Sequence, residues 1–315
     1  MEQGQNSWPF PLGHGRACPG HPDYLVPSNP DRDRRDKPGD DAESFAPVAR
    51  VARRAWRAND FSDGDRSIPE ETAIAFTYNG TSYAVMMATP QDLEDFACGF
   101  SLTEGIVSSL DEIEELDIVE SEIGIELRMW LTAPQSAAFG ERRRRLAGPT
   151  GCGLCGIESL SEACRPPPVV PDGQLFTPRE IMRAIDSIGP SQTLNRETRA
   201  VHGAAFWEPS CGLVAMREDV GRHNALDKLG GALARDHVVG RGGMILLTSR
   251  VSVEMVQKAA VIGVPFVVAI SAPTALAVRT AQAAGITLVA IARGDGFEIF
   301  THPRRVAKER VAHVA

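Results

Sequence analysis

The first regular pattern of hydrophobic positions begins near residue 71. Residues 73–78 and 81–88 are rich in β-branched and aromatic side chains, and they flank Asn79-Gly80. An Asn-Gly pair between two such runs is the strongest short sequence signal for a β-hairpin. Residues 123–131 have the same character. The pattern therefore predicts a hairpin and a further strand in a β-rich N-terminal part.

Two segments have sequences typical of helix starts. Thr89-Pro90 combines an N-cap residue with a proline in the first turn, and apolar residues follow on one face at Leu93, Phe96 and Phe100. Residues 177–180, Thr-Pro-Arg-Glu, form a capping-box sequence. It predicts a helix that packs through Ile181, Ile185 and Ile188.

The last third of the chain alternates between apolar runs and amphipathic segments. The pattern predicts strands at residues 244–248, 264–270 and 286–292, and helices at residues 252–262 and 273–284. A β-α-β-α-β order is typical of a parallel sheet covered by helices.

The N-terminal segment has a different composition. Residues 1–47 contain eight prolines and five glycines but only 12 hydrophobic residues. Such a segment buries too little apolar surface to offset the entropy of ordering the chain. We therefore expect residues 1–60 to be an N-terminal extension that is disordered or lies outside the functional module, and residues 61–315 to form the functional domain.

Charge and hydropathy exclude two classes of partner. The 315-residue chain has a net charge of -8, which is unlike a general nucleic-acid binder. Residues 259–278 carry no charge, but Gly263, Pro265 and Pro273 interrupt them, so they are unlike a membrane-spanning helix. The opening Met-Glu-Gln-Gly-Gln is unlike a secretory signal. We expect no nucleic acid, no membrane and a cytoplasmic location.

The motif Gly151-Cys152-Gly153-Leu154-Cys155-Gly156 is the first candidate for chemistry. Flexible glycine backbone and the nearby arginines at residues 142–145 would stabilise a thiolate, which could attack a persulfide sulfur. Two alternatives remain open. Zinc would need two further ligands, and a thioredoxin-like pair would need a βαβ context directly before it.

A second candidate is the segment Arg217-Glu-Asp-Val-Gly-Arg-His223. The sequence predicts a strand that ends near Arg217 and a helix that starts after Gly221. The helix N-terminus, Arg222 and Lys228 could hold a phosphate, with His223 as a proton or hydrogen-bond donor. The alternative is ordinary capping by Asp219 beside a structural histidine.

Further polar residues fall at the predicted strand ends. Residues 291–296 follow a parallel strand, where ligands of α/β sheets gather, and Arg293 and Asp295 suit a phosphate and a guanine edge. A plain turn explains the same residues. Residues 248–250 and 271–274 fit pocket walls or helix caps equally well, and His202 is a secondary candidate.

Eight segments in this order resemble the formate dehydrogenase accessory sulfurtransferase family, FdhD/NarQ. They include Gly-Cys-Gly-Leu-Cys-Gly-Ile-Glu and Glu-Asp-Val-Gly-Arg-His-Asn-Ala-Leu-Asp-Lys, and lie at residues 78–80, 99–105, 151–158, 218–228, 247–250, 254–258, 270–278 and 301–303. The resemblance implies a cytidine-deaminase-like α/β fold, with a central mixed sheet covered by helices and a β-rich N-terminal part.

The resemblance also implies a sulfurtransferase that works through a cysteine persulfide. Such a protein takes sulfur from a cysteine desulfurase and passes it to the molybdenum bis(pterin guanine dinucleotide) cofactor before insertion into formate dehydrogenase. Matched position by position, Cys152 is the persulfide-carrying catalytic residue and Cys155 its companion. The cofactor-binding stretch comprises Ile291, Ala292, Arg293, Gly294, Asp295 and Gly296.

Three hypotheses follow for the function. The first is this sulfurtransferase, with no metal of its own and with a homodimer as one arrangement. The second is a non-catalytic chaperone of the molybdenum cofactor. The third is a zinc- or redox-dependent C-x-x-C binding protein. Deamination is disfavoured, because Ala204 follows His202 where H-x-E is required and Gly151 precedes Cys152 where P-C-x-x-C is required.

Overall fold

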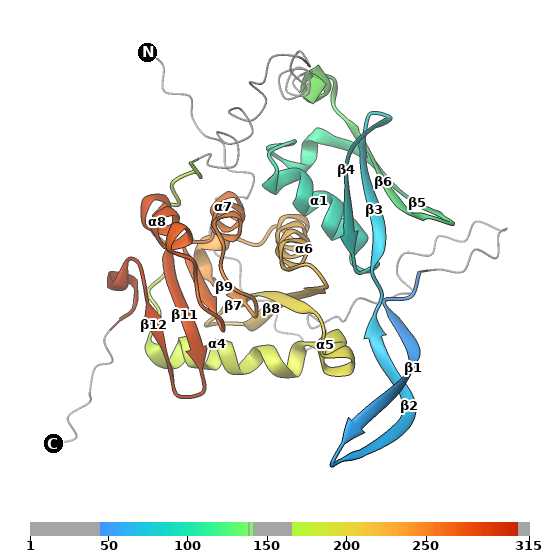
Figure 1. The fold of residues 1–315 in the computed structure, drawn as a ribbon. Coiled ribbons are helices and arrows are strands. Elements are labelled where there is room, and N and C mark those ends of the chain that lie inside the picture. Colours follow the sequence, from blue (N-terminus) through green and yellow to red (C-terminus); the bar gives the residue numbers. More distant parts are fainter. Residues whose placement is uncertain (1–44, 138, 141–165, 308–315) are drawn as a thin grey trace, which may run out of the picture.

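The chain folds around a six-stranded mixed sheet (Figure 1). The computed structural model describes residues 45–137, 139–140 and 166–307. The strand order of this sheet is β12-β11-β10-β9-β7-β8. The strands are β7 (His202–Glu208), β8 (Gly212–Asp219), β9 (Met244–Leu247), β10 (Phe266–Ala269), β11 (Thr287–Arg293) and β12 (Gly296–Ile299).

Three central strands of the sheet are parallel. β9, β10 and β11 run in one direction, and β7 and β12 lie antiparallel on either side. Their side chains alternate between two apolar layers, because successive residues of a strand point to opposite faces. Ile245 and Leu247 of β9 belong to one layer, and Met244 and Leu246 belong to the other.

Helices cover both faces of this sheet. α4 (Pro178–Ser191) packs on one face, through Ile181, Ala184, Ile185 and Ile188. The other face is covered by α6 (Arg222–Arg235), α7 (Val253–Ile262) and α8 (Ala275–Ala284). The remaining short helices are α5 (Thr193–Thr198), η2 (Leu110–Glu112), η3 (Gly240–Gly242) and η4 (Pro303–Arg305).

The N-terminal part is β-rich, as predicted. A four-stranded sheet has the order β4-β3-β6-β5 and packs against α1 (Leu93–Thr103). Its strands are β3 (Thr72–Tyr78), β4 (Thr81–Ala88), β5 (Ile113–Ser121) and β6 (Gly124–Leu131). The expected α/β class, with a central mixed sheet and a β-rich N-terminal part, is therefore confirmed.

The two sheets are joined by the contact between α1 and α6. A Cβ atom at Gly99 would lie 1.7 Å from the carbonyl oxygen of Asp227, and one at Gly231 would lie 1.9 Å from that of Asp95. Both distances are far below van der Waals contact, so only glycine allows the two helix backbones to approach this closely.

The prediction of a helix start at Thr89-Pro90 was wrong, because α1 begins at Leu93 after Asp92. Thr89 is fully buried instead. Its N–H donates to the Asp219 carboxylate over 3.0 Å, and its carbonyl oxygen accepts from Lys228 over 2.8 Å. The Thr89 hydroxyl, the group that would cap a helix, instead accepts from the N–H of Val220 over 3.2 Å.

A two-stranded ribbon precedes the four-stranded sheet. It consists of β1 (Val48–Arg57) and β2 (Asp60–Pro69), which pair antiparallel over their whole length. The boundary that we expected at residue 60 falls at its turn, so the structure does not divide the chain there.

The uncharged segment at residues 259–278 is shared among α7, β10 and α8. Within the described ranges, no helix is long and apolar enough to cross a membrane.

Candidate functional site

Residues 291–296 form the end of β11, a turn and the start of β12. β11 and β12 pair at Arg293 and Gly296, and a bulge interrupts the register between Ala290 and Arg293. Arg293, Gly294 and Asp295 are exposed, whereas Ala292 is fully buried in the apolar layer under α4. The exposed part of this stretch is therefore available to a ligand, and Ala292 anchors it to the core.

The backbone at Ile291 is strained. Its φ angle is 53°, in the left-handed region that a β-branched residue adopts only at a cost of about 1–3 kcal/mol. The bulge holds it there, and the Ile291 N–H donates to the carbonyl of Ser271 over 3.2 Å. Strain of this kind clusters at functional sites. The backbone strain at Ile291 is therefore a structural observation, separate from the sequence motif, that points to this turn.

Other strand ends share this edge of the sheet. β9, β10 and β11 end here, and β7 begins here because it runs antiparallel to β9. Thr248 follows β9, and its hydroxyl accepts from the N–H of Gly203 over 2.8 Å. The structure thus brings residues 291–296, Ser271, Thr248 and His202 to one edge of the sheet, which we call the polar rim.

The start of α6 lies beside the polar rim, but much of its motif serves the fold. Asp219 is fully buried. Its carboxylate accepts from the N–H groups of Gly221 and Thr89, from the Asn224 amide and from the Lys228 ammonium, over 2.7–3.0 Å. Lys228 is also fully buried, so the expectation that it helps to bind a phosphate was wrong. The capping role that we kept open for Asp219 is confirmed.

Glu218 has a structural role as well. Its carboxylate accepts from the N–H groups of Leu194 and Asn195, over 2.8 and 2.9 Å, at the start of α5. Burial raises the pKa of Glu218, and these backbone hydrogen bonds oppose the rise. This residue of β8 therefore caps α5, which has no side-chain cap of its own.

His202 on the polar rim and His223 at the start of α6 are biased toward the neutral form. Burial and the Arg222 guanidinium lower the pKa of His202 and of His223. His223 Nε2 lies 3.5 Å from the Ser252 hydroxyl and 3.8 Å from the Glu254 carboxylate. Each neutral ring can accept one hydrogen bond and donate another.

Two buried donors beside the rim have no hydrogen-bond partner among the described residues: Arg222 Nε and Gln192 Nε2. Gln192 is 7% exposed, and its amide lies over Gly203. Sequence reasoning missed Gln192, because a single glutamine after a helix carries no local signal. With Arg293, these groups supply donors suited to an anionic ligand.

Cys152 and Cys155 lie outside the described residues. Among the described residues, no group of three or more His, Cys, Asp and Glu side chains is arranged to hold a metal ion. Cys98, on α1, is buried in the core, and burial raises the pKa of its thiol to about 11.

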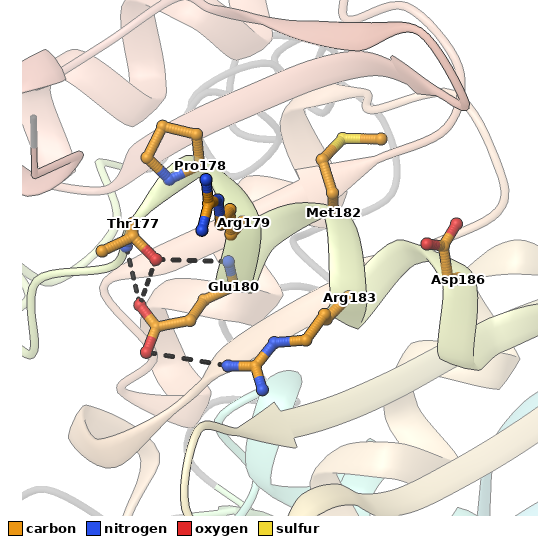
Figure 2. Close-up of a pocket in the computed structure, with 7 residues that line it drawn as sticks. All are labelled: Thr177, Pro178, Arg179, Glu180, Met182, Arg183 and Asp186. Carbon is orange, nitrogen blue, oxygen red and sulfur yellow. Dashed lines mark hydrogen bonds and ion pairs between the residues drawn. The ribbon is translucent and has the colours of Figure 1, made fainter. Parts of the chain in front are cut away.

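A surface hollow of about 620 Å³ runs along α4, as Figure 2 shows. Three of its polar side chains, Thr177, Glu180 and Arg183, interact with one another. Glu180 accepts from the N–H and hydroxyl of Thr177, over 2.7 and 2.8 Å, and lies 4.0 Å from Arg183. The hydrogen bonds between Thr177 and Glu180 are those of the predicted capping box, so these two side chains serve the start of α4.

Comparison with known proteins identifies the family. The model of the FdhD/NarQ family matches residues 69–307. A relative from Agrobacterium fabrum, named sulfur carrier protein FdhD, is 53% identical over 265 residues, which cover 83% of this chain and 97% of the relative. A relative of the same name from Brucella abortus is 55% identical over 253 residues, which cover 80% of this chain and 94% of the relative.

A solved structure agrees with this result. It is the crystal structure of a protein from Desulfotalea psychrophila described as a formate dehydrogenase accessory protein. The two proteins are 25% identical in sequence, and their structures match with a TM-score of 0.66. The match covers 83% of this chain and all of the other. Sequence and fold agree, and the chain belongs to the FdhD/NarQ family.

Proposed function

We propose that this protein carries sulfur to the molybdenum bis(pterin guanine dinucleotide) cofactor of a formate dehydrogenase. The observation that carries the proposal is the similarity, above 50% identity, to relatives named sulfur carrier protein FdhD. The glycine-flanked C-x-x-C motif supplies thiols for that role.

Loading is a thiol exchange. The thiolate of Cys152 attacks the terminal sulfur of a persulfide on a cysteine desulfurase. The S–S bond of the donor breaks, the donor leaves as a thiolate, and a new S–S bond forms on Cys152. No oxidant or reductant is consumed. Cys155 assists by stabilising the Cys152 thiolate or by accepting the sulfur. Because the reaction needs a free thiolate, we place it in the cytoplasm.

The polar rim is the proposed site for the cofactor as substrate. The guanine dinucleotide end would lie against residues 291–296, where Asp295 can accept from the N–H edge of guanine and Arg293 can neutralise phosphate. The strained backbone at Ile291 and the unpaired donors of Gln192 and Arg222 support this placement.

The test of sulfur loading is intact-mass analysis after incubation with a cysteine desulfurase and cysteine. We expect the mass of added sulfur on wild type, its loss on reduction, and no loading of Cys152→Ala. Cys98→Ser is the matched control and should load normally, because Cys98 is buried. Loading of Cys152→Ala to the wild-type level would refute the role of Cys152.

The same variants separate the alternatives. A chaperone that only binds the cofactor would let Cys152→Ala activate formate dehydrogenase fully. A zinc protein would contain stoichiometric zinc and lose it equally in Cys152→Ala and Cys155→Ala. The sulfur carrier instead predicts inactive client enzyme with Cys152→Ala and partial activity with Cys155→Ala.

Calorimetry with GDP tests the cofactor site. Asp295→Ala should weaken binding by about 1–3 kcal/mol, the value of a charge-assisted hydrogen bond. Glu298→Ala is the control, because it removes an exposed carboxylate from the adjoining strand β12. Equal affinity in both variants and wild type would exclude Asp295 as a guanine contact.

A further inference from the structure

Two buried hydrogen-bond donors flank the start of β7. Gln192 follows α4 and Arg222 begins α6, and these two helices cover opposite faces of the central sheet. The Gln192 amide nitrogen lies 3.1 Å from the position that a Cβ atom of Gly203 would occupy. Burial, and then the charge of Arg222, lower the pKa of His202. Because His202 and Gly203 are successive residues of β7, their side-chain positions face opposite sides of the sheet, and each donor approaches the strand from its own side.

Neither donor is satisfied within the part of the chain that the structure describes. Gln192 Nε2 and Arg222 Nε are both buried without a hydrogen-bond partner there, and Gln192 is only 7% exposed. The acids at the end of β8 do not relieve them. Asp219 already accepts from four donors, and Glu218 from two backbone N–H groups at the start of α5. Unpaired buried donors are rare and costly, so these two indicate an acceptor from outside the chain.

The chemistry of this acceptor follows from the groups that face it. Both unpaired groups can only donate, and Arg222 adds a positive charge. α6 starts after Gly221, which has no side chain to cap the helix, and a helix N-terminus favours an anion. A nucleobase edge presents donors as well as acceptors, whereas phosphate oxygens only accept. A phosphate group therefore fits this end of the polar rim best.

The distance between the two ends of the polar rim suits one extended nucleotide. β7 and β11 are separated by β9 and β10, so three strand spacings, about 14 Å, lie between them. Thr248 follows β9 and Ser271 follows β10, between the two ends. Resting on the proposed function, we propose that Gln192 and Arg222 bind the diphosphate of the nucleotide whose guanine lies against residues 291–296. The ribose then crosses the ends of β9 and β10.

This role gives Gln192 a signature that a structural residue lacks. Gln192→Leu removes the unpaired donor and keeps a side chain of similar size. The melting temperature of the free protein should therefore stay the same or rise, because no buried donor remains unsatisfied. Binding of the diphosphate should weaken in the same variant. A glutamine that only supports the fold would lose stability and binding together.

The test is calorimetry with GDP and with guanosine on the full chain. Wild type should bind GDP more tightly, and inorganic pyrophosphate should compete with GDP. Gln192→Leu should weaken GDP binding by about tenfold, equivalent to about 1.4 kcal/mol, and leave guanosine binding unchanged. Gln192→Glu keeps the size of the side chain and should weaken GDP binding further, because its carboxylate opposes the phosphates. Asp295→Ala should instead weaken both ligands alike.

Gln282→Leu is the control, because it makes the same change at an exposed position of α8 and should alter neither affinity. Wild-type affinity for GDP in Gln192→Leu would overturn the inference, as would an equal loss of GDP and guanosine. A wild type that binds guanosine as tightly as GDP would refute the diphosphate site and leave the guanine site standing. A wild type that binds neither would refute the cofactor site itself, whereas sulfur loading of Cys152 is measured separately and does not depend on it.

Discussion

Replacing Lys228 by methionine removes a charge from the interior while keeping a side chain of similar length. Lys228 and Asp219 are both fully buried, and the ammonium lies 2.7 Å from the carboxylate. The ammonium also donates to the Thr89 carbonyl over 2.8 Å and lies 5.3 Å from the centre of the Phe96 ring. Lys228→Met therefore leaves one buried charge uncompensated and one buried carbonyl without its donor.

The expected cost follows from this burial. Removing one partner of a buried ion pair destabilises a protein by about 3–5 kcal/mol, because the remaining charge keeps its desolvation penalty. Asp219 retains three other donors, Thr89, Gly221 and Asn224. These hold its position but do not neutralise it. A loss of this size is a large fraction of the 5–15 kcal/mol that is usual for a folded protein.

The assay is denaturation with urea, followed by circular dichroism, with Arg54→Met as the matched control. Arg54 and Asp63 are also 2.7 Å apart, but their side chains are 66% and 70% exposed. The control should leave the denaturation midpoint unchanged, because exposed ion pairs contribute little. Equal midpoints for both variants, or a loss below about 1 kcal/mol in Lys228→Met, would refute the reasoning from burial.

Three further predictions follow from the site and the core. Ile291→Gly should lower the free energy of unfolding by about 1–2 kcal/mol less than Ile291→Ala, because both variants lose the side chain that packs against the core and only glycine adopts the positive φ without strain; equal losses would contradict the strain at this position. The free energy of unfolding should fall as pH drops below about 6.5, because burial holds the pKa of His202 and His223 down while the unfolded chain takes up protons; a variant with glutamine at both positions should lose that part of the decline. Cys98 should resist iodoacetamide in the folded protein at about pH 8 and react after unfolding, since its thiol pKa is raised to about 11; rapid reaction of the native protein would contradict its burial.

Local patterns predicted the elements whose causes are local. The Asn79-Gly80 turn joins β3 and β4 as expected, and Thr177 and Glu180 form both hydrogen bonds of the capping box. The parallel strands β9 and β10 were predictable because they are buried on both faces and therefore apolar throughout. For these elements, a few neighbouring residues carry enough information.

The misses have long-range causes. Thr89 has a good capping side chain, but its hydroxyl accepts from the N–H of Val220, more than a hundred residues away, and Asp219 and Lys228 bind its backbone. From the sequence alone a lysine is expected to be exposed, and only the structure shows that Lys228 is buried beside Asp219. The ribbon of β1 and β2 was missed because its strands are mostly exposed and rich in charged and small residues, so no alternating apolar face marks them in the sequence. Residues 291–296 were predicted from the family resemblance, and the strain at Ile291 emerged only from the backbone.

The glycine contact between α1 and α6 has a consequence for how this fold can be divided. Because the helix backbones touch at Gly99 and Gly231, no layer of side chains separates α1 from α6 at this contact. A protein cut between the two helices would expose the bare peptide groups at Gly99 and Gly231, and any larger residue at either position would prevent the halves from packing together again. Neither half is therefore a transferable module, and a chimera between relatives must take both helices from the same parent.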